Sequence, residues 1–256
     1  MRRLAQSALM LSLSALVSLS TAAFAQAPAP AAAATPAKDI PRMPDGKPNF
    51  QGFWNIQYVP NMGIGKEAEI PYTPAGKKAY VEHDAKDDPT SWCHYPGVPR
   101  IMSSPYPVQI LQTPEYVILA HEYMKLWRVI PTDHRPHPEN APSSFMGDTV
   151  GWWEGDTFVF ETVALNDHTW LDTAGHQHTD QMRVIEKLRW ADNKKDLELE
   201  FTIYDPKMYS KPWTHKRTWK ALPPAQAPGL PMLLEYECQE NNKDLEHLMS
   251  LKPGAE

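Results

Sequence analysis

Most of this chain between residues 53 and 238 consists of short segments in which apolar and polar residues alternate, separated by turn-forming residues. The clearest segment is residues 197–203 (LELEFTI), in which every apolar side chain falls on one face of an extended strand. Such alternation is typical of strands that bury one face and expose the other to water. The pattern predicts an all-β domain.

Turn-forming residues divide these segments into about ten expected strands, with little helix between them. The strands are residues 53–58, 108–112, 116–123, 125–131, 149–153, 157–163, 181–190, 196–204, 214–222 and 233–238. Because short turns join most of them, they should form an antiparallel meander. A meander of this size has to protect its edge strands, and closing into a barrel does so. The alternative fold is a two-sheet β-sandwich.

Helix is expected at two places. Residues 73–83 have Thr73 as a helix N-cap and Pro74 at the first helical position. Residues 240–247 form a short terminal helix. The proline-rich and aromatic residues 91–107 are expected to form an ordered loop packed on the domain.

The first 39 residues differ in composition from the rest. Residues 1–25 read as a secretory signal peptide, with Arg2 and Arg3 before an apolar stretch and a cleavage pattern after Ala25. A retained anchor helix is the alternative. Residues 26–39 form an Ala/Pro-rich linker, and residues 40–256 a single β-barrel domain. We therefore expect a periplasmic or secreted protein.

The charge balance bears on the partners of the protein. The formal net charge is −6, and there is no basic run after the first residues. An acidic chain of this kind argues against nucleic acid and against anionic membrane surfaces. We expect no stable membrane insertion after signal cleavage, and a small molecule as the partner. No feature of the sequence specifies an oligomeric state.

The two cysteines, Cys93 and Cys238, are far apart in the sequence. In an oxidising compartment such a pair suggests one disulfide, between the region before the main sheet and the last strand. The alternative is two buried free thiols.

Six of the ten histidines lie between residues 121 and 180, and we look for chemistry there. In the first group, His137 is a candidate general base, Asp133 could orient it, and Arg135 could stabilise negative charge on an oxygen. The structural alternative is that Asp133 and Arg135 simply pair and hold the loop.

The second group is His168 with Asp172, where His168 is a candidate base and Asp172 its orienting carboxylate. An exposed turn followed by a core tryptophan is the alternative interpretation. In the third group, His176 and His178 have the His-x-His spacing that places both rings on one face of an extended segment. These two could bind a divalent metal with a third histidine, although we expect no cofactor.

Aromatic residues are numerous for one domain. Tyr123, Trp127, Trp153 and Trp170 are candidate substrate-binding residues, because inward-facing aromatics can line an apolar cavity in a barrel. Core filling is the alternative role for each of them.

Five motifs carry a family resemblance. They are WCHYPGVPR at 92–100, RVIPTDHRPHP at 128–138, GWWEGDTFVFET at 151–162, DPKMYSKPW at 205–213 and EYECQEN at 235–241. Together they resemble a widespread group of uncharacterised exported bacterial proteins. The resemblance implies an exported, lipocalin-like β domain and no particular reaction. His134 stands where that group has glycine, which weakens a catalytic role for His134, whereas Arg135 and His137 fit the pattern.

These observations predict an exported enzyme that uses histidine-based acid-base catalysis, as a lyase, isomerase or hydrolase. Its substrate would be a small, partly apolar or aromatic molecule bound in the barrel. Residues 133–137 and 168–178 should then meet over an aromatic pocket at one rim. The alternatives are a non-catalytic, lipocalin-like binding protein and a structural envelope protein.

Overall fold

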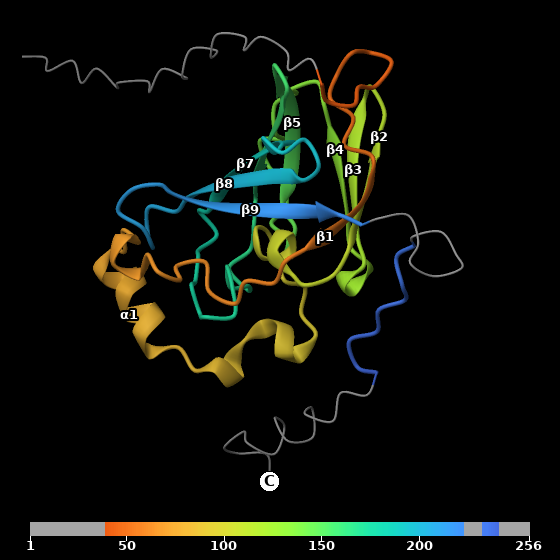
Figure 1. Ribbon diagram of the computed structural model, residues 1–256. Coiled ribbons are helices and arrows are strands. Elements are labelled where there is room, and N and C mark those ends of the chain that lie inside the picture. The colour runs from red at the N-terminus through yellow and green to blue at the C-terminus, as the bar shows by residue number, and fades with distance from the viewer. Residues whose placement is uncertain (1–38, 223–231, 241–256) are drawn as a thin grey trace, which may run out of the picture. The chain divides into compact units, whose positions relative to one another are not determined.

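The structure is a computed structural model that describes residues 39–222 and 232–240 (Figure 1). Nine strands form one sheet. They are β1 (Gly52–Ile56), β2 (Val108–Gln112), β3 (Tyr116–His121), β4 (Trp127–Pro131), β5 (Asp148–Glu154), β6 (Thr157–Val163), β7 (Arg183–Trp190), β8 (Leu197–Tyr204) and β9 (Trp213–Ala221).

The sheet is an antiparallel meander that closes on itself, as the sequence predicts. Its order is β4-β3-β2-β1-β9-β8-β7-β6-β5, so the first strand pairs with the last. In that pairing Trp54 lies opposite Ala221 and Ile56 opposite Trp219. The result is a nearly closed barrel, not a two-sheet sandwich.

The two ends of this strand order, β4 and β5, meet at a seam. Strand direction alternates along the nine strands, so β4 and β5 point the same way. No backbone ladder joins these two strands among the described residues, although the His134 amide donates to the Gly151 carbonyl at 3.0 Å. Residues 132–147 run back along the seam from the end of β4 to the start of β5.

The connections give the barrel two different ends. At the tight end, short turns at 113–115, 155–156 and 191–196 join the strands. At the other end, here called the loop end, lie the long connections 57–107, 164–182 and 205–212 and the short connection 122–126. Figure 1 shows helix α1 and the helical turns gathered beside the loop end.

Helix α1 (Pro74–Glu82) lies within the predicted range and has the predicted cap. The Thr73 hydroxyl oxygen accepts a hydrogen bond from the Gly76 amide at 3.0 Å, and Pro74 occupies the first turn. Five short 3-10 turns occur elsewhere: η1 (Glu67–Glu69), η2 (Ala85–Asp87), η3 (Pro89–Trp92), η4 (Arg100–Ser103) and η5 (Tyr123–Lys125). No described helix has the length and apolar character needed to cross a membrane.

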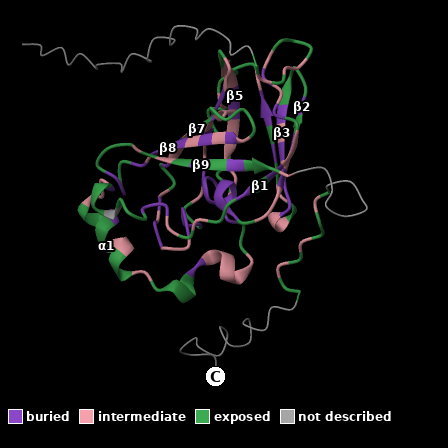
Figure 2. Ribbon diagram, in the orientation of Figure 1, coloured by how far each residue is buried: buried purple, intermediate pink, exposed green. Residues whose placement is uncertain are grey.

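Alternate residues of most strands fill the interior of the barrel, whereas β6 buries three successive residues, Phe158, Val159 and Phe160 (Figure 2). On β8 the burial pattern alternates without exception, and Leu197, Phe201 and Ile203 are fully buried. The turn η4 enters the interior from the loop end, where Met102 is also fully buried. Trp219 donates its indole N–H to the Met102 carbonyl at 3.3 Å, which fixes η4 against β9.

The C-terminal segment corrects one prediction. Residues 233–238 are not a tenth strand, because β9 already pairs with β1 and leaves no edge for a following strand.

The predicted disulfide is confirmed: Cys93 and Cys238 are bonded, with 5.8 Å between their Cα atoms. The helix expected at 240–247 falls almost entirely outside the described residues, as do the signal peptide and nearly all of the linker.

One ion pair crosses the interior. Arg128 on β4 donates two hydrogen bonds to Glu186 on β7, at 2.6 and 3.0 Å, and both side chains are almost fully buried. The same guanidinium donates to the Thr162 hydroxyl on β6 at 2.8 Å. The pair thus ties the edge strand β4 to strands on the far side of the seam.

We predict that Arg128→Met lowers the free energy of unfolding by about 3–5 kcal/mol, because it leaves the Glu186 carboxylate buried without a partner. The double variant Arg128→Met/Glu186→Met should recover most of that loss. Urea denaturation measures both values. The matched control is Arg189→Met, which breaks a half-exposed pair with Glu198 and should cost about 1 kcal/mol or less. An equal loss in the control would contradict the role of the interior pair.

Candidate ligand site at the loop end

Strand β9 carries polar side chains into the barrel. Its sequence WTHKRTWKA places Trp213, His215, Arg217 and Trp219 on the inward face, and the burial pattern alternates accordingly. His215 and Arg217 are not among the site residues predicted from the sequence, because they lie outside the histidine-rich residues 121–180. The period-two alternation of residues 213–219 was the signal that could have found them.

Asp172 and His176 form a buried pair in the connection between β6 and β7. The His176 Nδ1 atom lies 2.7 Å from Asp172 Oδ2, and both side chains are at most 1% exposed. The Met62 amide donates to the same carboxylate at 2.6 Å. Because a carboxylate accepts, Nδ1 of His176 donates to Asp172, and the second ring nitrogen, Nε2, points away from this pair. This Nε2 atom has no hydrogen-bond partner among the described residues.

His176 is held by aromatic packing and by the close approach of residue 63. Its ring stacks on Tyr80, with 4.6 Å between the centroids. A Cβ atom at Gly63 would lie 3.3 Å from His176 Nε2 and 2.5 Å from Ile70 Cδ1. Glycine therefore lets this segment pass directly over the imidazole.

A pocket of about 540 Å³ lies on the other side of that segment, and we call it the rim pocket. It is formed by residues 62–71 and 211–216 at the loop end. Met62 and Ile70 supply apolar surface. Its polar lining comprises Lys66, Glu69, Lys211, Trp213, Thr214, His215 and Lys216.

The polar side chains that line the rim pocket favour the binding of a negatively charged ligand. Burial, followed by the nearby Arg217 charge, lowers the pKa of His215 to about 4, so this ring is neutral at pH 7. His215 Nε2 and Trp213 Nε1 are buried without a partner among the described residues. Lys216 pairs with Glu200 at 3.0 Å, so Lys66 and Lys211 against Glu69 leave the rim a positive balance of one charge.

Arg217 places a further positive charge behind this site. It is 7% exposed, donates Nε to the Ser103 hydroxyl at 3.3 Å, and is in no ion pair within the described part of the chain. Burial lowers its pKa to about 10, and the Asp172 carboxylate opposes that shift. Arg217 therefore remains charged at pH 7, close to Asp172.

The structure does not bring the predicted catalytic residues together. Arg135 pairs with Asp133 at 2.8 Å on the surface, beside a groove along the seam. His168 is exposed and lines another pocket with Trp92 and His94. Asp172 lies in neither of these, so the two loop groups do not meet over one pocket.

His137 is oriented by a carboxylate other than the predicted Asp133. Its Nδ1 contacts Asp148 at 2.5 Å, while Nε2 lies 3.5 Å from Glu161 and makes no hydrogen bond among the described residues. His137 thus shares with His176 a ring with one nitrogen on an aspartate, but it lies outside the rim pocket.

The four aromatic candidates are also dispersed. Trp127 is 69% exposed on the outer face of β4. Trp153 packs on Phe50, and Trp170 meets the edge of His83. Tyr123 stacks on a second tyrosine and lines a separate cavity at the loop end.

The two histidines considered as metal ligands have different partners. His176 faces Asp172, whereas His178 Nε2 lies 2.6 Å from the Thr169 hydroxyl and its Nδ1 lies 3.1 Å from the Thr179 carbonyl. Across residues 39–222 and 232–240, no group of three or more His, Cys, Asp or Glu side chains is arranged to hold a metal ion.

Comparison with known proteins adds no assignment: neither the models of protein families nor the curated proteins include a match to this chain. The family resemblance carried by the GWWEGDTFVFET motif therefore stays a prediction.

The burial of His121 predicts how the free energy of unfolding depends on pH. Burial, with a smaller contribution from Arg128, lowers the pKa of His121 to about 3. Below pH 6.5 the unfolded chain takes up a proton at this histidine that the folded chain does not. Stability is therefore retained above pH 6.5 and falls as the pH is lowered, by about 2–3 kcal/mol between pH 7 and pH 4.5.

Denaturation of the His121→Gln variant over this pH range should show a shallower decline than that of the wild type. His168→Gln alters an exposed histidine and serves as the control, with an unchanged slope. Equal slopes for the wild type and His121→Gln would contradict the assignment.

Proposed function

We propose that this chain is an exported binding protein whose rim pocket takes a small, partly apolar anion. The observation that carries the proposal is the coincidence of an apolar wall with the lysines Lys66 and Lys211 in one pocket. Buried polar groups in proteins nearly always have hydrogen-bond partners. His215 Nε2 and Trp213 Nε1 have none among the described residues, but both atoms are buried, so a ligand in the pocket reaches them only after a side-chain movement.

The lining indicates how such a molecule would lie. Its carboxylate would face Lys66 and Lys211 at the rim. Its apolar body would contact Met62 and Ile70, where each buried methylene contributes about 0.8 kcal/mol. A small aromatic or aliphatic acid combines both properties.

Two further features support export. Residues 1–25 have the pattern of a secretory signal, and the Cys93–Cys238 disulfide is of the kind that persists in oxidising compartments.

Calorimetric titration with benzoate and with its neutral analogue benzamide tests the binding proposal. Benzoate should bind more tightly, and Lys66→Gln/Lys211→Gln should weaken it about 3–10-fold, because each lost charge-assisted contact is solvent-exposed. Lys187→Gln/Lys220→Gln removes the same charge from the outer faces of β7 and β9 and is the matched control. Equal affinity for both compounds, or an equal effect of the control, would reject the proposal.

An acid-base enzyme is the second candidate, and the Asp172–His176 pair favours it. A carboxylate orients one ring nitrogen while the other is free to accept a proton, which is the arrangement of a general base. Because Gly63 lies between His176 and the rim pocket, substrate access requires this segment to shift.

If the wild type turns over any small aromatic or aliphatic acid in a substrate screen, His176→Gln should reduce kcat by about 10²–10⁴-fold. His168→Gln is the control, since His168 is exposed and lines a different pocket. Absence of turnover by the wild type, or equal losses in both variants, would remove the enzyme from consideration.

A further inference from the structure

A second cavity at the loop end differs in chemistry from the rim pocket. Its volume is about 220 Å³, and we call it the tyrosine pocket because its lining includes four tyrosines, Tyr58, Tyr106, Tyr123 and Tyr236. Tyr106 and Tyr123 stack with 5.0 Å between centroids, and Tyr236 meets both rings edge-on, at 5.1 and 5.0 Å. Offset and edge-to-face geometry of this kind is the favourable one for aromatic rings.

Hydroxyl groups connect the tyrosines to a buried ion pair. The Tyr236 hydroxyl interacts with those of Tyr123 and Tyr106, and the Tyr123 hydroxyl with Thr90. Thr90 in turn accepts from Arg100 at 2.8 Å and donates to Asp88 at 2.9 Å. Arg100 and Asp88 form two further hydrogen bonds to each other and are each more than nine-tenths buried. These contacts hold the hydroxyls in place around the cavity.

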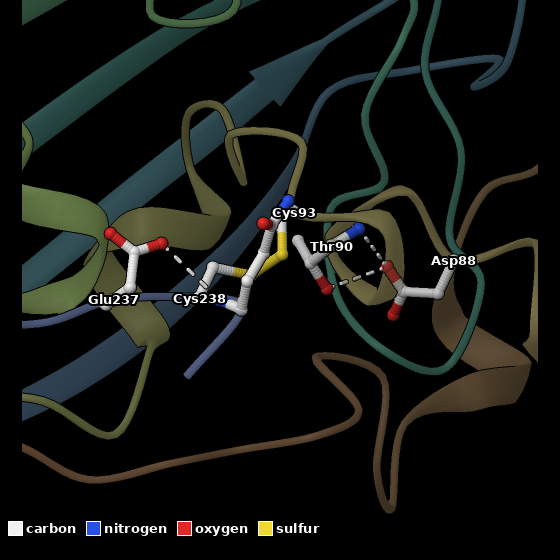
Figure 3. The surroundings of a disulfide bond; sticks show 6 residues. Asp88, Thr90, Cys93, Glu237 and Cys238 are labelled. Atoms are coloured by element: carbon white, nitrogen blue, oxygen red, sulfur yellow. Dashed lines mark hydrogen bonds between the residues drawn. A yellow bond between two sulfur atoms is a disulfide. The ribbon is translucent and has the colours of Figure 1, made fainter. Parts of the chain in front are cut away.

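The C-terminal segment forms one wall of this pocket. The Leu234 amide donates to Glu122 at 2.8 Å, Glu235 pairs with Lys125, and Tyr236 lines the cavity. Two residues after Tyr236, Cys238 is bonded to Cys93, which directly follows η3. Figure 3 shows this disulfide close to Thr90 and Asp88. One covalent bond therefore ties the wall that carries Tyr236 to the wall that carries Thr90.

The charges of the pocket disfavour an anion. Asp88 neutralises Arg100, while Asp172 adds a carboxylate to the lining. Burial raises the pKa of Tyr123 and of Tyr236, so both phenols keep their protons. The Ser103 hydroxyl accepts from Arg217 and can direct its own proton at a ligand oxygen. The groups thus match a neutral molecule with an aromatic ring and a hydroxyl.

We propose that the tyrosine pocket is a second binding site, for a small neutral phenol, and that the Cys93–Cys238 disulfide keeps it assembled. The site shares no lining residue with the rim pocket, so this inference stands independently of the anion-binding function. The cavity is large enough for a single aromatic ring. The faces and edges of that ring can pack against the rings of the surrounding tyrosines.

Fluorine NMR titration of the full chain with 4-fluorophenol tests the proposal, with fluorobenzene and 4-fluorobenzoate as comparison probes. 4-Fluorophenol should bind at least 5-fold more tightly than fluorobenzene. Tyr236→Phe and Ser103→Ala each remove one hydroxyl and should weaken its binding about 3–10-fold. Tyr95→Phe, at an exposed tyrosine outside the pocket, is the matched control and should have no effect.

The disulfide is tested by Cys93→Ala/Cys238→Ala, which should lose at least 10-fold in affinity for 4-fluorophenol. If that variant does not fold, the single hydroxyl variants still decide the outcome. Benzoate should not displace bound 4-fluorophenol, because it is assigned to the other pocket. Equal binding of fluorobenzene, equal effects of Tyr236→Phe and Tyr95→Phe, or displacement by benzoate would each overturn the proposal.

Discussion

The Arg128–Glu186 ion pair stabilises the barrel where the backbone cannot. Eight of the strand junctions are antiparallel ladders, but β4 and β5 run in the same direction and no ladder joins them among the described residues. Arg128 projects from the edge strand β4 and reaches Glu186 on β7 and Thr162 on β6. A buried charge pair is costly to desolvate, and this one is offset by several hydrogen bonds across the interior. It holds the two sides of the seam together.

Both candidate pockets lie at the loop end, and this follows from the meander. Short turns cover the tight end and leave little room for a site, whereas three long connections meet at the other end. Asp172 lies at the loop end and has a different relation to each of the two pockets. It orients His176 behind the rim pocket, and it lines the tyrosine pocket. One buried carboxylate thus sets the electrostatics of two adjacent cavities.

Much of the fold could be predicted from local patterns. The bounds of β2 and β6 agree with the alternation of apolar residues, and α1 follows its Thr73 cap. The expected strand at 233–238 was wrong, because the alternation does not reveal that β1 already occupies the edge of β9. The candidate site was harder to predict. A histidine count directed attention to residues 121–180, but His137 and His168 lie apart and His215 was overlooked.

The sequence by itself determined what depends on neighbours along the chain: the strand segments, the helix cap, and the pairing of the two cysteines, which have no other cysteine to bond. The tertiary structure decided which side chains meet. His176 could have faced a metal, a substrate or solvent, and its Asp172 partner, its Tyr80 stack and the covering Gly63 come from three different segments. These contacts depend on barrel closure and on strand register. Burial and charge act between residues that are distant along the chain, so they produce no periodic pattern in the sequence.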